Sequence, residues 1–242
     1  MFMLSYSWSY AFGDILDTLV DFCRSQELDP KRTYVWICCL CVNQHRVVQQ
    51  SKTEQSGMLA PTVNFFAEFG QRVARIGHLL AMMSPWQNPT YLKRVWCIFE
   101  LYTSHIEGCE VTVVMPPSEK KALEEDLFGE SGNIKVFYDV LSKTKVEDAQ
   151  ASVEKDRIAI LEMIKEKPGY HVLNDRLNAL LCGWIRRVTV EVIKMRQEAF
   201  QNHGNELSYE QLNQLRSGRH DAAHRMLQNM YTLRLQPESG SE

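Results

Sequence analysis

Short apolar runs recur along the first part of the chain and predict the strands of a parallel sheet. The run Thr33–Val42 is apolar almost throughout, and the run 78–84 resembles it. Continuous apolarity is typical of strands that are covered by helices on both faces. The predicted strands are residues 2–8, 33–42, 78–84, 110–115 and 134–140.

Segments with helical periodicity separate these runs. After Gly13 and Asp14, apolar residues recur at the spacing of an amphipathic helix, and Pro30 follows it. Asn88 and Pro89 indicate a helix start, with asparagine as N-cap and proline at the first helical position. Further helices are predicted over 65–77, 89–106 and 118–129. Strands and helices that alternate in this way predict an α/β fold, with a doubly wound parallel sheet of five strands.

After residue 143 the pattern becomes helical. Lys145–Lys167 carries an apolar stripe and ends before Pro168, and Asn174 is the expected N-cap of a longer helix. Each stripe needs a partner surface, and the sheet domain is the obvious one. We therefore expect a sheet domain over 1–142, a helical extension packed on it over 143–202, and short helices with a disordered tail over 203–242.

The composition is that of an ordinary soluble globular protein, because 45% of the 242 residues are hydrophobic and 24% are charged. The formal net charge of −3 lacks the basic excess of a nucleic-acid-binding surface. No apolar run approaches the roughly 20 residues of a membrane span, and the N-terminal residues lack the pattern of a signal peptide. We therefore expect a cytoplasmic protein with no membrane span and no nucleic-acid partner.

The cysteines favour reduced thiols over a disulfide framework, because their number, seven, is odd and most of them lie in apolar runs. Cys38, Cys39, Cys41 and His45 lie close enough in sequence to suggest a zinc site. On a strand, however, Cys39 and Cys41 share one face and Cys38 points to the other. Core packing is therefore the favoured interpretation, and no metal site is predicted.

Polar side chains follow three of the predicted strands at their carboxyl ends. The ligand crevice of a doubly wound sheet lies outside these ends, where the strand order reverses, so the side chains are expected to converge. Their hydroxyls, amides and indoles suit a ligand with a flat base and sugar hydroxyls. For any one of them alone, turn capping is the alternative role. The candidate binding residues are Ser5, Tyr6, Ser7, Trp8, Asn43, Ser84 and Trp86.

Glu100 is the candidate catalytic residue. It follows Trp96 and Cys97 by one helical turn, so its carboxyl group is expected beside an indole and a thiol. A partly apolar setting raises the pKa of a carboxyl group and strengthens its interaction with a developing positive charge. Trp96 joins the candidate substrate-binding residues. In the alternative interpretation, Glu100 is a solvated helix residue, and Trp96 and Cys97 belong to the core.

Three motifs carry a resemblance to a known family: Phe2-Met-Leu-Ser-Tyr-Ser-Trp8, Ser84-Pro85 and Trp96-Cys-Ile-Phe-Glu100-Leu101. With them, residues 1–140 resemble the Toll/interleukin-1 receptor (TIR) domain family. Other segments are similar to a poorly characterised group of algal and protist TIR-like proteins. These segments are Tyr34-Val-Trp-Ile-Cys38, Asn43-Gln44-His45 and Arg94-Val-Trp96-Cys97.

The resemblance implies a flavodoxin-like sheet of five parallel strands and one of two functions. Catalytic TIR domains cleave NAD at the nicotinamide–ribose bond, and the glutamate of their Trp-Cys-x-x-Glu motif, here Glu100, is the catalytic residue. The resemblance also implies that Ser5–Trp8 and Asn43 line the nucleotide, that 46–61 is a flexible loop, and that catalytic forms work as oligomers. NAD is then the substrate of an NAD glycohydrolase or an ADP-ribosyl cyclase, with linear or cyclic ADP-ribose as the product, and no cofactor is expected.

The second function is that of a non-catalytic signalling or protein-interaction module that self-associates or docks a partner. It is motivated by a departure from the family, because Ser9-Tyr10-Ala11-Phe12 stands where an acidic residue and an arginine are usual. The second predicted strand also ends in Asn43-Gln44, where many members have an aspartate nearby. A remoter alternative on the same fold is chemistry like that of nucleoside deoxyribosyltransferases, with Glu100 as nucleophile.

Overall fold

The computed structural model describes residues 1–42, 65–128 and 145–203. The expected fifth strand at 134–140, the loop 46–61 and the segment 204–242 lie outside the described residues, as do Asn43 and His45. The described chain has an α/β fold built on a parallel sheet, which confirms the fold class at that level.

Within the described residues, four strands form the sheet, in the order β2-β1-β3-β4, and each neighbouring pair is parallel. They are β1 (Phe2–Ser5), β2 (Val35–Ile37), β3 (His78–Met82) and β4 (Glu110–Val114). Leu4 of β1 lies opposite Ile37 on one side and Leu80 on the other. Each strand lies within a predicted strand and is shorter than the sequence pattern indicates.

Helices connect and follow the strands, and the positions of the longer ones agree with the helical periodicity. They are α1 (Phe12–Ser25), the short α2 (Cys38–Cys41), α4 (Phe65–Ile76), α5 (Val95–Ile106), α6 (Pro117–Phe128), α8 (Glu154–Glu166) and α9 (Tyr170–His203). Two short 3-10 helices are η1 (Thr90–Lys93) and η2 (Val146–Asp148). Among the described helices, none is both long enough and apolar enough to cross a membrane.

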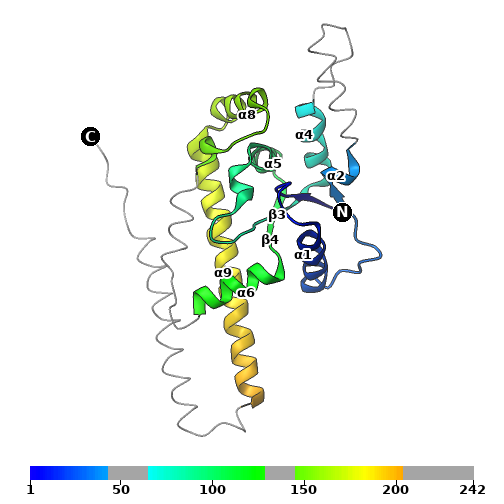
Figure 1. Ribbon diagram of the computed structural model, residues 1–242, viewed down its shortest axis with the longest axis vertical. Helices are drawn as coiled ribbons and strands as arrows, with labels where there is room; N and C mark the ends of the chain where they lie inside the picture. The colour runs from blue at the N-terminus through cyan, green and yellow to red at the C-terminus, as the bar shows by residue number, and fades with distance from the viewer. Residues whose placement is uncertain (43–64, 129–144, 204–242) are drawn as a thin grey trace, which may run out of the picture.

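The two faces of the sheet carry separate apolar clusters, because successive strand residues point to opposite faces. Leu4 and Leu80 belong to a cluster with Ile15 and Phe22 of α1. Met3 and Leu79 belong to a larger cluster with apolar residues of α4, α5, α8 and α9. Figure 1 shows α1 on one side of the strands and α5 and α9 on the other. The sheet is therefore covered on both faces, which explains why its strands lack polar alternation.

The second predicted strand is wrong over its carboxyl half. Val35–Ile37 is a strand, but Cys38–Cys41 is a single helical turn, in which Cys39 and Cys41 are exposed. The cysteines therefore neither alternate on a strand nor all pack in the core. Among the described strands, β2 has β1 as its only neighbour, and it pairs with residues 2–4 of β1 alone. None of the seven cysteines, all within the described part of the chain, forms a disulfide.

The helix that carries Glu100 begins later than predicted. Pro89 precedes the 3-10 turn η1, and α5 starts at Val95, with Arg94 as its N-cap residue. The side chain of Arg94 makes no capping hydrogen bond. Its backbone instead forms a parallel bridge with Gln150, where Val95 donates to the carbonyl of Gln150 at 2.9 Å. The start of α5 is thus fixed by a distant segment rather than by local capping.

The helical region after residue 145 differs from the prediction in two places. Residues 145–167 do not form one helix, because η2 and an irregular stretch precede α8. Asn174 lies inside α9, which begins at Tyr170, and is not its N-cap. Its side chain instead accepts a hydrogen bond from the Val146 amide at 2.9 Å and donates one to Glu147 at 3.0 Å. Asn174 therefore ties η2 to α9, while α8 packs on α5 and α9 packs on β4.

Candidate functional site

The candidate site is a buried hydrogen-bonded cluster where β1 ends against α5. Ser5 is the last residue of β1, Tyr91 lies in η1 and Glu100 lies in the middle of α5. The hydroxyl of Ser5 is hydrogen bonded to the carboxyl group of Glu100 and also to the hydroxyl of Tyr91, at 2.8 Å. Three segments far apart in sequence therefore meet at one serine.

The protonation of Glu100 decides the direction of these hydrogen bonds, because a serine hydroxyl has only one proton to donate. When Glu100 is ionised, Ser5 donates to the carboxylate and accepts from Tyr91. When Glu100 is protonated, its own O–H donates to Ser5, and Ser5 donates to Tyr91. The hydroxyl of Ser5 therefore keeps both of its partners in either protonation state of Glu100.

Burial dominates the electrostatics of the cluster. Ser5 and Tyr91 are 0% exposed and Glu100 is 7% exposed. Removal from water disfavours the ionised carboxyl group and raises the pKa of Glu100 to about 8, although the hydrogen bond from Ser5 acts in the opposite direction. At neutral pH the carboxyl group is therefore mainly protonated. Glu100 is not the solvated helix residue of the alternative interpretation.

Cys97 and Tyr91 hold no charge that would stabilise an ionised Glu100. Burial raises the pKa of the Cys97 thiol well above its ordinary value, and the nearby Glu100 raises it further. The thiol donates to the backbone carbonyl of Tyr6 at 3.4 Å. The pKa of Tyr91 is also raised, first by burial and then by the charges of Cys97 and Glu100. Both groups stay protonated and do not act as nucleophiles at neutral pH.

Tyr10 fixes the turn that carries Tyr91. The backbone amides of Ser84 and Tyr91 both donate to the hydroxyl of Tyr10 at 3.1 Å, and this hydroxyl donates to the carbonyl of Met82 at 3.3 Å. Thr90 closes the same turn by donating to the carbonyl of Ser84 at 3.0 Å. Ser84 is therefore held at the carboxyl end of β3 through its backbone. The hydroxyl of Tyr10, which follows β1, thus joins this turn to the segment after the first strand.

Sequence reasoning assigned no role to Tyr91 or Tyr10. Tyr91 lies nine positions before Glu100, a spacing that places two residues on no common helix face, and η1 separates it from α5. Tyr10 follows β1 in a short turn before α1. Their phenol groups meet the site only through the pairing of β1 with β3. The local sequence holds no signal for such a contact.

The other candidate residues near the end of β1 have different settings. Ser7 is buried and its hydroxyl lies 2.9 Å from that of Ser9. Tyr6 is buried beside Cys39, and burial raises the pKa of its phenol above the ordinary value. Trp8 is exposed. These three side chains surround the end of β1, whereas the hydrogen bond to the carboxyl group of Glu100 comes from Ser5.

The two other candidate tryptophans, Trp86 and Trp96, each make a hydrogen bond to a helix outside the cluster. The backbone amide of Trp86, which is buried, donates to Glu119 of α6 at 2.8 Å. The indole of Trp96 stacks on Phe66 with 5.1 Å between ring centroids, and its N–H donates to Asp156 of α8 at 3.3 Å. The contacts of Trp96 therefore join α5 to α4 and α8. The indole expected beside the carboxyl group of Glu100 serves the packing of α5.

The cluster offers a carboxyl group in an environment that excludes water, and little else that is reactive. Such a group can donate a proton while it is protonated, or stabilise a nearby cation once it is ionised. Because the carboxyl group is buried, a ligand reaches it only if side chains around it move. Within the described ranges, no group of three or more histidine, cysteine, aspartate or glutamate side chains is placed to hold a metal ion.

The raised pKa makes the stability of the fold depend on pH. Between pH 4.5, the ordinary pKa of glutamate, and about 8, the folded state keeps the Glu100 proton that the unfolded state has lost. The contribution of the Glu100 proton to the free energy of unfolding is therefore fully present below pH 4.5. It falls by about 1.4 kcal/mol per pH unit as the pH rises to 8. We expect Glu100→Gln to match wild type near pH 4.5 and to exceed it by several kcal/mol at pH 8, in urea unfolding.

The matched control is Glu107→Gln, which removes an exposed carboxyl group at the end of the same helix. The difference between its free energy of unfolding and that of wild type should change far less over this pH range. If wild type and Glu100→Gln kept a constant difference between pH 4.5 and 8, Glu100 would not be a buried, protonated group.

Comparisons of the chain with models of protein families, with curated proteins and with solved structures give no match. The residues of this chain alone therefore indicate its function. Glu100, Ser5 and Tyr91 indicate it most, because together they combine burial, a shifted pKa and a place at the carboxyl end of a central strand.

Proposed function

We propose that the chain carries a TIR-like domain with a flavodoxin-like sheet, and that it cleaves NAD at the nicotinamide–ribose bond with Glu100 as the catalytic residue. The observation that supports this most is the carboxyl group of Glu100, buried against Ser5 at the carboxyl end of β1. The strand order β2-β1-β3-β4 supports the same assignment. In sheets of this order the ligand crevice lies between the ends of β1 and β3, next to Ser5 and Ser84.

The proposed reaction breaks the bond between the ribose C1′ and the pyridinium nitrogen. The bonding electron pair goes to the nitrogen, so nicotinamide leaves as a neutral molecule and needs no acid. Positive charge develops on the ribose as an oxocarbenium ion, which an ionised Glu100 stabilises as carboxylates do in glycosidases. A water molecule then adds to C1′ and releases a proton, which gives ADP-ribose.

The raised pKa of Glu100 fits this reaction if the substrate itself ionises the carboxyl group. The nicotinamide ring of NAD carries a positive charge, and an opposite charge within a few ångströms lowers the pKa of a carboxyl group. In a site without water the interaction between the two charges is much stronger than in solution. Glu100 is then neutral in the free protein and ionised when the cation is bound.

The candidate binding residues would have three different roles under this proposal. Ser5 would contact the sugar nearest to Glu100, with Tyr6, Ser7 and Ser84 along the crevice. Trp8, which is exposed beside the end of β1, offers a flat surface for a base. Trp86 and Trp96 are held by α6 and α8 and would shape the site from behind. We further propose a cytoplasmic location, in keeping with thiols that form no disulfide within the described chain.

Glu100→Gln should lower nicotinamide release from NAD by about 100-fold or more, the effect of removing one electrostatic contact to a transition state. The measurement is chromatography of nicotinamide at high protein concentration, because catalysis by assembled copies is part of the proposal. Glu107→Gln, the exposed control, should keep wild-type activity. A folded Glu100→Gln protein with wild-type activity would rule out this role for Glu100.

The pH profile should identify the active state of the carboxyl group. If the carboxylate is required, kcat/KM rises with pH and levels off above about 8, because that is the pKa of Glu100 in the free protein. Ser5→Ala removes a hydrogen bond that lowers this pKa, so the rise should move to higher pH. A profile that falls through pH 8 would instead show that the protonated carboxyl group acts as an acid.

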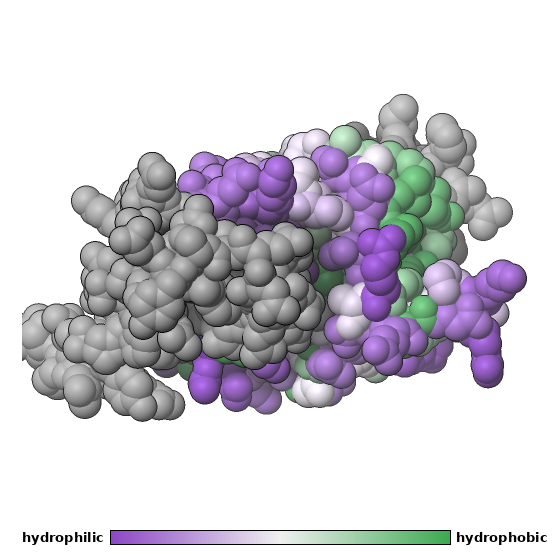
Figure 2. Space-filling model, turned by 90° about the horizontal axis from the view of Figure 1, so that it is seen from below, coloured by the Kyte–Doolittle hydropathy of each residue, from purple (hydrophilic) through white to green (hydrophobic). Residues whose placement is uncertain are grey.

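The alternative function, a non-catalytic interaction module, is favoured by one observation. Trp8, Phe12, Leu16 and Val20 are exposed apolar residues, and the last three follow one another at four-residue spacing on α1. Figure 2 shows that hydrophobic side chains also gather at the surface of the molecule among hydrophilic ones. An apolar stripe of this kind is typical of a contact with another protein surface. We propose a second copy of this chain as its partner.

Sedimentation velocity at increasing protein concentration tests the alternative. Wild type should form larger species as the concentration rises, and Leu16→Glu should remain a monomer because it places a charge within the stripe. Gln26→Glu introduces the same charge at the end of α1 and should behave as wild type. A wild-type protein that stays monomeric at all concentrations would contradict self-association through α1.

A further inference from the structure

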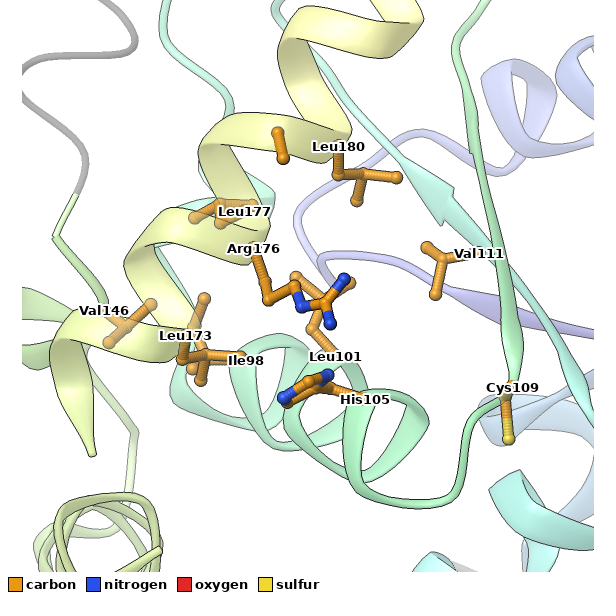
Figure 3. Close-up of a pocket in the computed structure, with 11 residues that line it drawn as sticks. Ile98, Leu101, His105, Cys109, Val111, Val146, Leu173, Arg176, Leu177 and Leu180 are labelled. Carbon is orange, nitrogen blue, oxygen red and sulfur yellow. The ribbon is translucent and has the colours of Figure 1, made fainter. Parts of the chain in front are cut away.

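A pocket of about 280 Å³ lies between α5, β4 and α9 (Figure 3). Ile98, Leu101 and His105 of α5 form part of its wall. Ile98 and Leu101 each lie one position along the helix from Cys97 and Glu100, on a neighbouring face. The pocket shares no lining residue with the Ser5–Tyr91–Glu100 cluster, so a ligand in it is independent of the proposed function.

The walls of the pocket are apolar. They are formed by branched side chains from two helices and one strand, chiefly Ile98, Leu101, Val111, Leu173, Leu177 and Leu180. No aspartate or glutamate is among the lining residues. A surface of this kind favours the hydrocarbon part of a ligand and provides no acceptor for a cationic one.

Two nitrogen-bearing side chains lie on this apolar surface, Arg176 of α9 and His105 of α5. Figure 3 shows the guanidinium group of Arg176 and the imidazole ring of His105 projecting into the same part of the pocket. Within the described part of the chain, Arg176 makes no ion pair and no side-chain hydrogen bond. Arg176 is exposed, so a permanent positive charge stands at the solvent side of an apolar pocket, with no acidic partner among the described residues.

We propose that this pocket binds a small amphipathic carboxylate. The carboxylate pairs with the guanidinium group of Arg176, which can hold both oxygens at once, and His105 donates a further hydrogen bond. The hydrocarbon chain lies among the leucines of α9 and the apolar residues of α5 and β4. One permanent cation matches a monoanion, whereas a phosphate with two charges would leave one uncompensated beside an apolar wall.

The size of the pocket sets the length of the ligand. A chain of about eight carbons, at roughly 30 Å³ per carbon, fits within a volume of about 280 Å³. Octanoate is therefore the probe. For a ligand of this size at one charged contact, a Kd on the order of 100 µM is expected.

Isothermal titration of the full chain with octanoate tests the proposal, with octan-1-ol as the uncharged probe of the same length. Octanoate should bind at least about ten times more tightly than octanol. Arg176→Gln should weaken octanoate binding at least about tenfold and leave octanol binding unchanged. Arg186→Gln, which changes an exposed arginine farther along α9 outside the pocket lining, should bind octanoate as wild type does.

A second variant tests the location independently of charge. Ala179 lines the pocket and is exposed, so Ala179→Phe should fill the space while the protein stays folded. It should abolish binding of both probes. The proposal is overturned if folded wild type binds no octanoate, if octanol binds as tightly as octanoate, if Arg176→Gln binds normally, or if inorganic phosphate displaces octanoate at lower concentration.

Discussion

The placement of Glu100 constrains the centre of this molecule, because a carboxyl group is enclosed where the first strand meets α5. Burying a charged carboxylate without a partner is costly, so the group is protonated or must find a cation. The fold accommodates the neutral form by placing the hydroxyl of Ser5 against it, and Ser5 is in turn hydrogen bonded to the hydroxyl of Tyr91. These hydrogen bonds join the end of β1 to η1 and to the middle of α5.

The helix α5 cannot move to relieve this burial, because it is packed on nearly every side. Eight of its residues are buried: Val95, Cys97, Ile98, Phe99, Glu100, Leu101, Thr103 and Ser104. On the side of α4, Trp96 and Phe99 pack against Phe66. On the side of α8, Trp96 donates to Asp156. With contacts to β3 and β4 as well, α5 holds Glu100 in place.

The sequence predicted the order and class of the elements well, because apolar runs and helical stripes reflect burial directly. It predicted contacts poorly wherever they depend on pairing between distant segments. The apolar run 33–42 has no internal feature that separates a strand from a helical turn, and only the pairing with β1, which stops at Ile37, separates them. Asn174 has the residue type of an N-cap, but η2 lies near enough to use its amide instead.

The same difference between local pattern and pairing of distant segments applies to the candidate site. Glu100 and Ser5 could be singled out by their positions on a helix and at a strand end, since both follow from local pattern. Tyr91 could not, because its hydroxyl reaches Ser5 only after β1 and β3 have paired. Trp96 was expected beside the carboxyl group because it lies one turn before Glu100. Its large ring instead finds more apolar surface on Phe66, which the sequence around it does not reveal.

Under the proposed function, the burial of Glu100 also bears on which nucleotides react. The free energy that keeps the carboxyl group protonated must be overcome before it can stabilise a cation, and only a positive charge beside it provides this. Oxidised NAD carries that charge on its nicotinamide ring, whereas the reduced form has a neutral ring and a poor leaving group. A carboxylate that was already ionised in the free protein would attract cations of many kinds. A protonated carboxyl group, buried beside Ser5 and Tyr91, becomes charged only when a ligand places a cation at the end of β1. The burial that disfavours ionisation of Glu100 in the free protein is therefore a source of selectivity.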